Sequence, residues 1–131
     1  KQMGRRKSRE TAMKFIYQTE INKDDWQAQI SETVSDTKLS DNDASFTKEL
    51  IFGVKENIEE IDKKIKEFSK GWKIDRIPKI DLAILRVSIY EICYNDDIPF
   101  NVSVNEAIEL SKKYSTAESG TFINGVLSRL A

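Results

Sequence analysis

Residues 79–94, "KIDLAILRVSIYEICY", decide the fold class of this 131-residue chain. Apolar side chains would occupy nearly every face of a helix built from this stretch, and its polar side chains are isolated. A helix that is apolar on all sides is normally buried at the centre of a protein. We therefore expect a central helix here, in which Arg86 is a buried ion-pair or capping residue and not a catalytic one, and Cys93 fills space in the core.

The segments on both sides of this stretch also show helical spacing, with little of the alternation that is typical of strands. We expect helices over residues 5–21 and 25–34, over residues 46–68 with a break near Asn57, and in segments that begin near Ser103 and Ser119. Ser103 and Glu106 have the spacing of a capping box, in which two side chains satisfy backbone N–H groups at a helix start. Gly125 is expected to allow close approach of another helix. The predicted fold class is all-α.

Composition excludes several classes of function. The chain has no histidine and a single cysteine, so it lacks the usual general base and the commonest metal ligands. The sequence contains no Walker loop, and its acidic pairs at residues 59–60 and 96–97 are expected to lie on solvated surfaces. We therefore expect no catalytic residue, no metal site and no cofactor. No apolar run approaches the roughly 18 residues of a membrane span, and no signal-peptide core is visible, which predicts a cytoplasmic protein.

Charge is distributed unevenly along the chain. Residues 1–14 carry six basic side chains and one acidic side chain, a formal charge of +5, whereas the remaining residues carry −6. The stretch "MGRRKSRE" (residues 3–10) contains four of the basic residues, Arg5, Arg6, Lys7 and Arg9. A basic segment on an acidic body indicates one surface for a polyanion and another for basic partners.

Composition alone leaves two interpretations of this basic cluster open. It is either a solvated terminus, ahead of which Lys1 and Gln2 are a tag remnant, or a binding surface. The cluster continues into an amphipathic helix, so its charges would be presented from a folded surface. Tyr17 would lie on a neighbouring stripe, either as a stacking platform or as a partly buried aromatic side chain. Basic groups interleaved with a stacking aromatic are typical of proteins that bind single-stranded RNA or DNA.

Three segments together resemble the NusB family of bacterial transcription factors. They are "RRKSRETAMKFIYQTE" (residues 5–20), "IDLAILRVSIYEI" (residues 80–92) and "VSVNEAIELSKKYSTAESGTFINGVLSRL" (residues 102–130). The resemblance implies a compact all-α bundle of about seven helices in two small subdomains, which form a single RNA-binding domain over residues 1–131. It also implies a role without catalysis. Family members pair with NusE, a small-subunit ribosomal protein, bind the boxA segment of nascent RNA, and help assemble the antitermination complex on RNA polymerase, chiefly for ribosomal RNA.

The resemblance also implies roles for individual residues. The implied RNA-binding residues are Arg5, Arg6, Lys7, Arg9, Tyr17, Ser119, Phe122 and Asn124. The residues that it implies at the NusE surface are Asp81 and Glu118. Two positions depart from the family pattern. Thr121 stands where a Lys is common, which argues against a phosphate contact there, and Ser115 stands where a Gly often ends a helix, so this turn is expected to differ.

Two other functions stay open at this point. RNA-cytosine methyltransferases can carry a NusB-like N-terminal domain, and in a pure protein–protein adaptor the basic cluster would be incidental. The acidic body of the chain favours a basic ribosomal protein as partner, because opposite charges orient the encounter. Members of the family are monomers or homodimers, and the sequence does not decide between these states.

Overall fold

The structure, a computed structural model, describes residues 2–22, 25–71 and 73–131, and every regular element in these ranges is helical. Lys1 lies outside them, so the interpretation of residues 1–2 as a tag remnant is not tested. The elements are α1 (Gln2–Ile21), α2 (Trp26–Asp36), α3 (Asp41–Glu56), α4 (Ile58–Phe68), the 3₁₀ helix η1 (Ile74–Arg76), α5 (Lys79–Tyr94), α6 (Phe100–Tyr114) and α7 (Ala117–Ser128). The prediction of an all-α fold with about seven helices is confirmed.

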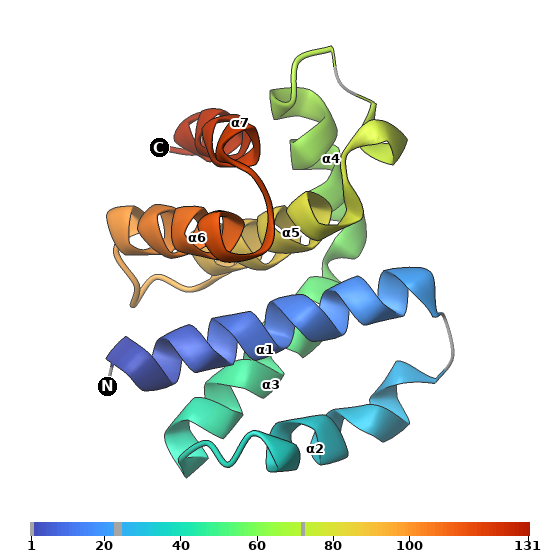
Figure 1. The fold of residues 1–131 in the computed structure, drawn as a ribbon, viewed down its shortest axis with the longest axis vertical. Helices are drawn as coiled ribbons and strands as arrows, with labels where there is room; N and C mark the ends of the chain where they lie inside the picture. Colours follow the sequence, from blue (N-terminus) through green and yellow to red (C-terminus); the bar gives the residue numbers. More distant parts are fainter. Residues whose placement is uncertain (1, 23–24, 72) are drawn as a thin grey trace.

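Helix α5 lies at the centre of the fold. Its residues from Asp81 to Glu91 are all buried, and Ile84, Leu85 and Ile89 have no exposed surface. It packs against α1, α3, α4, α6 and α7 (Figure 1). The expected central helix is therefore confirmed, because a helix with neighbours on every side needs apolar residues on every side.

The other helices form two groups around α5. Figure 1 shows α1, α2 and α3 together on one side, with α4, α6 and α7 on the other. One apolar cluster runs through both groups and includes Ile30 of α2, Ile61 of α4 and Ile123 of α7. Gly53 allows α3 to approach α5 closely, since a Cβ at this position would lie 2.1 Å from Cε1 of Tyr90. The two small helical groups therefore share one core.

The start of α6 differs from the sequence prediction. The helix begins at Phe100, directly after Pro99, and not near Ser103. Ser103 instead donates its Oγ–H to Glu91 of α5 at 2.6 Å, and Glu106 pairs with an arginine of α1 at 3.1 Å. The predicted capping box is therefore wrong, because both side chains have partners on other helices.

The start of α7 also lies earlier than predicted. The helix begins at Ala117, and the side chain of Thr116 accepts a hydrogen bond from the backbone N–H of Ser119. Ser115, in the turn before it, has a φ of −138°, so this turn does not need the glycine that is common in the family. The Oγ–H of Ser115 donates to Asp81 at 2.8 Å, which fixes the turn against α5.

Three further local predictions have different outcomes. The break near Asn57 is confirmed, since this residue ends α3 and precedes α4. The buried ion pair of Arg86 is also confirmed, with Asp62 at 2.9 Å and Glu20 at 2.8 Å. Burial lowers the pKa of Arg86, but the two carboxylates outweigh this effect and hold the pKa above its usual range. Cys93 is exposed, so its prediction as a core residue is wrong.

Gly125 has no close neighbour, because a Cβ built there would meet nothing within 4 Å. The prediction that it allows another helix to approach is therefore wrong. The acidic pairs at residues 59–60 and 96–97 are exposed, as expected. In the described ranges, no group of three or more acidic or Cys side chains could hold a metal ion, and no helix is long and apolar enough to span a membrane.

Candidate nucleic-acid interface

The basic cluster lies on the first turns of α1, so it belongs to a folded surface. One side of α1 is fixed to the core by Ala12, Phe15 and Ile16, which are at most 5% exposed. At the cluster itself, Ser8 has no exposed surface and donates its Oγ–H to the backbone carbonyl of Asp43 at 2.9 Å. The interpretation of the cluster as a solvated terminus therefore does not hold for these residues.

Arg9 is buried, unlike the other basic residues of the cluster. It is 4% exposed, and its Nε donates to both carboxylate oxygens of Glu91, at 2.9 and 3.2 Å. Glu91 also accepts the hydrogen bond from Ser103, and Glu106 lies 3.9 Å from the Arg9 guanidinium. The guanidinium of Arg9 faces α5 and α6 and not solvent, so the predicted RNA contact of Arg9 does not agree with its burial.

The remaining three basic residues are oriented by neighbours and still reach solvent. The guanidinium of Arg5 lies 4.0 Å from the ring centre of Phe46, and its side chain is 44% exposed. Arg6 donates from Nε to Glu106 at 3.1 Å and is 56% exposed. The Lys7 ammonium lies 3.7 Å from Glu10 and is 49% exposed. Partly exposed cations held in one orientation suit contacts to phosphate groups.

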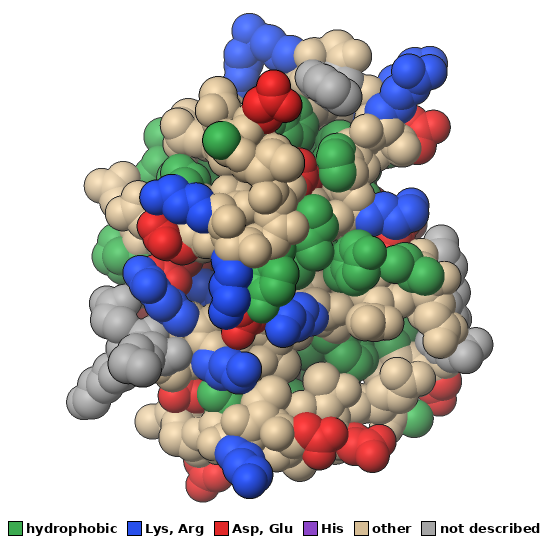
Figure 2. Space-filling view, viewed as in Figure 1, with side chains coloured by type: hydrophobic (Ala, Val, Ile, Leu, Met, Phe, Trp, Pro, Cys, Tyr) green, Lys and Arg blue, Asp and Glu red, His purple; other side chains and the backbone are tan. Residues whose placement is uncertain are grey.

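Helix α6 extends this surface with two lysines that were not among the predicted RNA-binding residues. Lys112 and Lys113 line a groove between α1 and α6 together with Arg6 and Lys7. Figure 2 shows Lys and Arg side chains gathered on this face over both helices. The only sequence signal was the pair of lysines near the end of a predicted helix, about 100 positions from the cluster. Local sequence does not reveal that the two segments lie side by side.

Glu10 connects the two helices in this groove. Its Oε2 accepts a hydrogen bond from Lys113 at 2.6 Å and another from the hydroxyl of Tyr114. Burial raises the pKa of Glu10, but these hydrogen bonds and the neighbouring lysines outweigh burial and hold the pKa below its usual range. The same contact raises the pKa of Lys113. Lys14 lies 5.2 Å from the Tyr114 ring, so cations surround this aromatic side chain.

The other predicted RNA-binding residues occupy different environments. Tyr17 is partly buried and packs against the core, and the part of its side chain that reaches solvent leaves a contact with RNA open. Phe122 is also partly buried, and Asn124 is exposed on α7. Ser119 is 8% exposed and donates its Oγ–H to Asp81 at 2.6 Å. The prediction of a direct RNA contact at Ser119 therefore does not agree with its burial.

The two residues predicted to face a protein partner are also different from each other. Asp81 is 2% exposed, and its two oxygens accept hydrogen bonds from Ser115 and Ser119. It joins α5 to the start of α7, and this burial does not agree with the predicted direct contact to NusE. Glu118 lies in the first turn of α7 and is exposed, so it remains available to a partner.

A family model described as "NusB family" matches residues 6–131, almost the whole chain. The chain belongs to the NusB family. The transcription antitermination protein NusB of Acetivibrio thermocellus is 56% identical to it over 128 residues, which cover 98% of this chain and 88% of the relative. The matched stretch covers 98% of this chain, so it takes in α1, the central helix and the C-terminal motif together.

Solved NusB structures have the same fold. NusB of T. maritima matches with a TM-score of 0.89 and 34% identity, covering 97% of this chain and 89% of that one. A chain from the structure of antitermination factors NusB and NusE in complex with double-stranded RNA matches with a TM-score of 0.88 and 24% identity, covering 99% and 97% of the two chains. This second likeness shows a common NusB fold.

Proposed function

We propose that this NusB family member is a transcription antitermination protein without catalytic activity. It binds the boxA segment of nascent RNA together with NusE and helps assemble the antitermination complex on RNA polymerase, so it acts in the cytoplasm. Its relatives carry the name transcription antitermination protein NusB. In the distant structural relative, NusB is seen with NusE and double-stranded RNA, and we carry both partners over to this chain as part of the proposal.

The observation that carries the RNA-binding proposal is the row of oriented, half-exposed cations on α1. Arg5, Arg6 and Lys7 each reach solvent while a carboxylate or an aromatic ring holds them in place. Lys112 and Lys113 add two cations from α6 across the same groove. We assign phosphate contacts to these side chains, because nucleic-acid affinity rests largely on Lys and Arg facing phosphates.

Arg9, Ser119 and Asp81 have positioning roles in this proposal. Arg9 fixes α1 to α5 through Glu91, and Asp81 fixes the start of α7 through Ser119. Asn124 and Phe122 on α7 and Tyr17 on α1 remain assigned to RNA. The exposed Glu118 is assigned to NusE, because acidic side chains favour encounter with a basic ribosomal protein.

A salt titration tests the proposal. Binding of boxA RNA in the presence of NusE is measured between 50 and 300 mM salt for the natural chain and for a variant with Arg5, Arg6 and Lys7 replaced by Ala. Three phosphate contacts contribute about −2 to the slope of log affinity against log salt, because each contact to a single strand contributes about −0.7. The variant should lose this part of the slope. A control with Lys48, Lys63 and Lys66 on α3 and α4 replaced by Ala should keep it.

The titration also separates the proposal from a protein–protein adaptor. An adaptor would still bind NusE, but its affinity for RNA would be equal in the natural chain, the α1 variant and the control. That result would overturn the assignment of the RNA surface to α1.

A further inference from the structure

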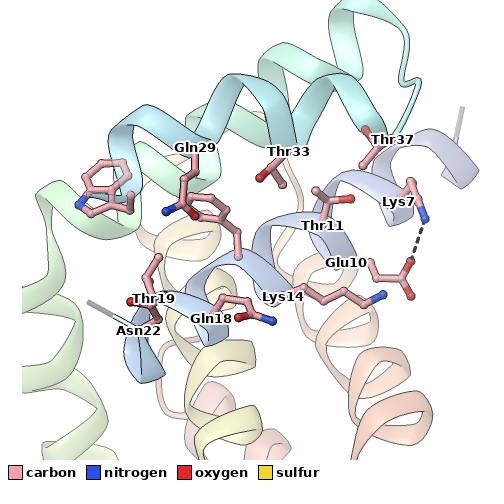
Figure 3. A pocket seen from close by; sticks show the side chains of 12 residues that line it. Lys7, Glu10, Thr11, Lys14, Gln18, Thr19, Asn22, Gln29, Thr33 and Thr37 are labelled. Atoms are coloured by element: carbon pink, nitrogen blue, oxygen red, sulfur yellow. Dashed lines mark ion pairs between the residues drawn. The ribbon is translucent and has the colours of Figure 1, made fainter. Parts of the chain in front are cut away.

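We propose that the groove between α1 and α2 binds the base of a nucleotide next to the RNA segment held on the basic face of α1. The inference rests on the proposed RNA-binding function and adds a base-binding pocket to it. The groove lies between α1 and α2 (Figure 3), and it shares Lys7 and Glu10 with the α1–α6 groove.

The groove has the size and the floor of a small-molecule pocket. Its volume is about 390 Å³, which lies in the range of about 300–1,000 Å³ that is usual for such pockets. Phe15 of α1 and Trp26 of α2 provide its apolar part. The Trp26 ring is held edge-on by Phe52 at 5.4 Å between ring centres, so an aromatic surface is fixed in the groove before any ligand arrives.

The walls carry polar groups that match the edge of a base. Gln18 of α1 faces Gln29 and Thr33 of α2 across the groove in Figure 3. Within residues 2–22, 25–71 and 73–131, no hydrogen bond engages the side chains of these three residues. An amide side chain both donates and accepts, as a base edge requires. Bases of single-stranded RNA are recognised by such contacts together with aromatic stacking.

The groove is continuous with the basic face. Lys7 and Glu10 line both this groove and the groove between α1 and α6. The ion pair between them forms a ridge between the two grooves (Figure 3). Lys14 also lines the α1–α2 groove, so its lining carries two ammonium groups and one carboxylate. That balance of +1 suits one phosphodiester group at the rim and an uncharged base inside.

The chemistry of the walls favours a base over a peptide. A peptide that docks through apolar anchors needs a continuous apolar groove, whereas amide or hydroxyl side chains interrupt the apolar surface here at seven of the twelve lining residues. RNA that runs along Arg6 and Lys7 would bring its next nucleotide directly to the ridge, so a base can enter without a second binding event.

The test compares three RNAs in the presence of NusE. One is a core boxA RNA, and the others carry three additional nucleotides at its 5′ or its 3′ end. One of the extensions should increase affinity about five-fold, because stacking and edge contacts of a single base have about that effect. The same extension with an abasic sugar at each added position should give no increase. An equal increase with the abasic RNA would show a phosphate contact only and would overturn the inference.

The matched variants place the effect in the groove. The double variant Gln18→Ala, Gln29→Ala should lose the five-fold increase and bind the core RNA as the natural chain does. Both side chains are exposed on helices, and alanine favours a helix, so the variant should fold normally. Gln27→Ala on the same α2 helix is the control, since Gln27 does not line the groove. An increase that persists in the double variant would overturn the inference. Failure of the core RNA to bind would instead refute the proposed function itself.

Discussion

Replacing Arg9 by Met should lower the free energy of unfolding of this protein far more than replacing Arg6 by Met. Arg9 is the partner of Glu91, whose side chain is 2% exposed and whose oxygens lie 2.9 and 3.2 Å from the Arg9 Nε. Without Arg9, Glu91 keeps the Ser103 hydrogen bond at 2.6 Å, but it loses the cation with which it forms its ion pair. Removing one member of a buried ion pair costs about 3–5 kcal/mol, because the other charge stays buried and unpaired.

The same substitution at Arg6 removes a surface contact. The Arg6 side chain is 56% exposed, and exposed pairs contribute about 0–1 kcal/mol. Urea unfolding followed by circular dichroism measures both variants, with the slope against urea as a check on two-state behaviour. A loss of about 3–5 kcal/mol is a large part of the 5–15 kcal/mol that stabilises a typical domain. It corresponds to a decrease in Tm of roughly 10–20 °C.

RNA binding should show the reverse order. Arg6→Met should reduce the slope of log affinity against log salt by about 0.7, which is a loss of about five-fold at 0.1 M salt relative to 1 M. Arg9→Met should keep the natural slope, provided that binding is measured at a temperature where the variant is folded. Equal stability of the two variants, or equal loss of slope, would refute the division into a buried anchor and an exposed contact.

Three further predictions concern other parts of the molecule. Gly53→Ala should destabilise the fold by about 1–3 kcal/mol, because its new methyl group would lie 2.1 Å from the Tyr90 ring. Gly125→Ala should stabilise the fold by about 1 kcal/mol, because its methyl group would meet nothing within 4 Å and alanine favours a helix. Thermal unfolding measures both variants. The pKa of Glu10 is lowered in the folded state, so its contribution to stability should be fully present above its ordinary pKa of 4.5 and should be lost as the pH falls through the lower folded value. The Glu10→Gln variant should therefore be less stable than the natural chain at pH 7, and this difference should disappear as the pH falls through the lowered folded pKa. Glu118→Lys should weaken NusE binding in calorimetry and leave the thermal stability unchanged, because this side chain is exposed; equal NusE affinity would contradict the assignment of this surface.

The sequence predicted the features of this fold that depend on local composition. The all-round apolar pattern of residues 79–94 is enough to place a central helix, and the break at Asn57 follows from local helix signals. The start of α6 could not be found in this way. Ser103 and Glu106 have a pattern that is normally local, but here their partners lie on other helices: Glu91, 12 positions before Ser103, and Arg6, 100 positions before Glu106. The spacing of two residues in the sequence does not show whether their side chains form hydrogen bonds with other helices instead of with the local backbone.

The candidate site shows the same limit in a sharper form. The sequence identified the basic cluster, but it did not show that Arg9 is buried while the other three basic residues are exposed. It also missed Lys112 and Lys113, because their position beside α1 depends on how α6 packs. The family resemblance predicted that Asp81 faces NusE, but a sequence pattern does not show whether a carboxylate is buried. Its burial and its hydrogen bonds with Ser115 and Ser119 show that it acts within the protein.

The geometry of α1 explains why one residue of the cluster had to become an anchor. Successive residues on an α-helix are separated by roughly 100°, so Arg6 and Lys7 point well away from Arg5, whereas Arg9 returns to within about 40° of it. Arg5 and Arg9 accordingly lie over the same Phe46 ring, at 4.0 and 5.4 Å from its centre. Arg5 is one turn nearer the end of the helix and reaches solvent, while Arg9 lies between α5 and α6. The buried ion pair thus fixes the rotation of α1 about its own axis. That rotation determines which side Arg6 and Lys7 present to RNA, so less conformational freedom is lost when the RNA binds.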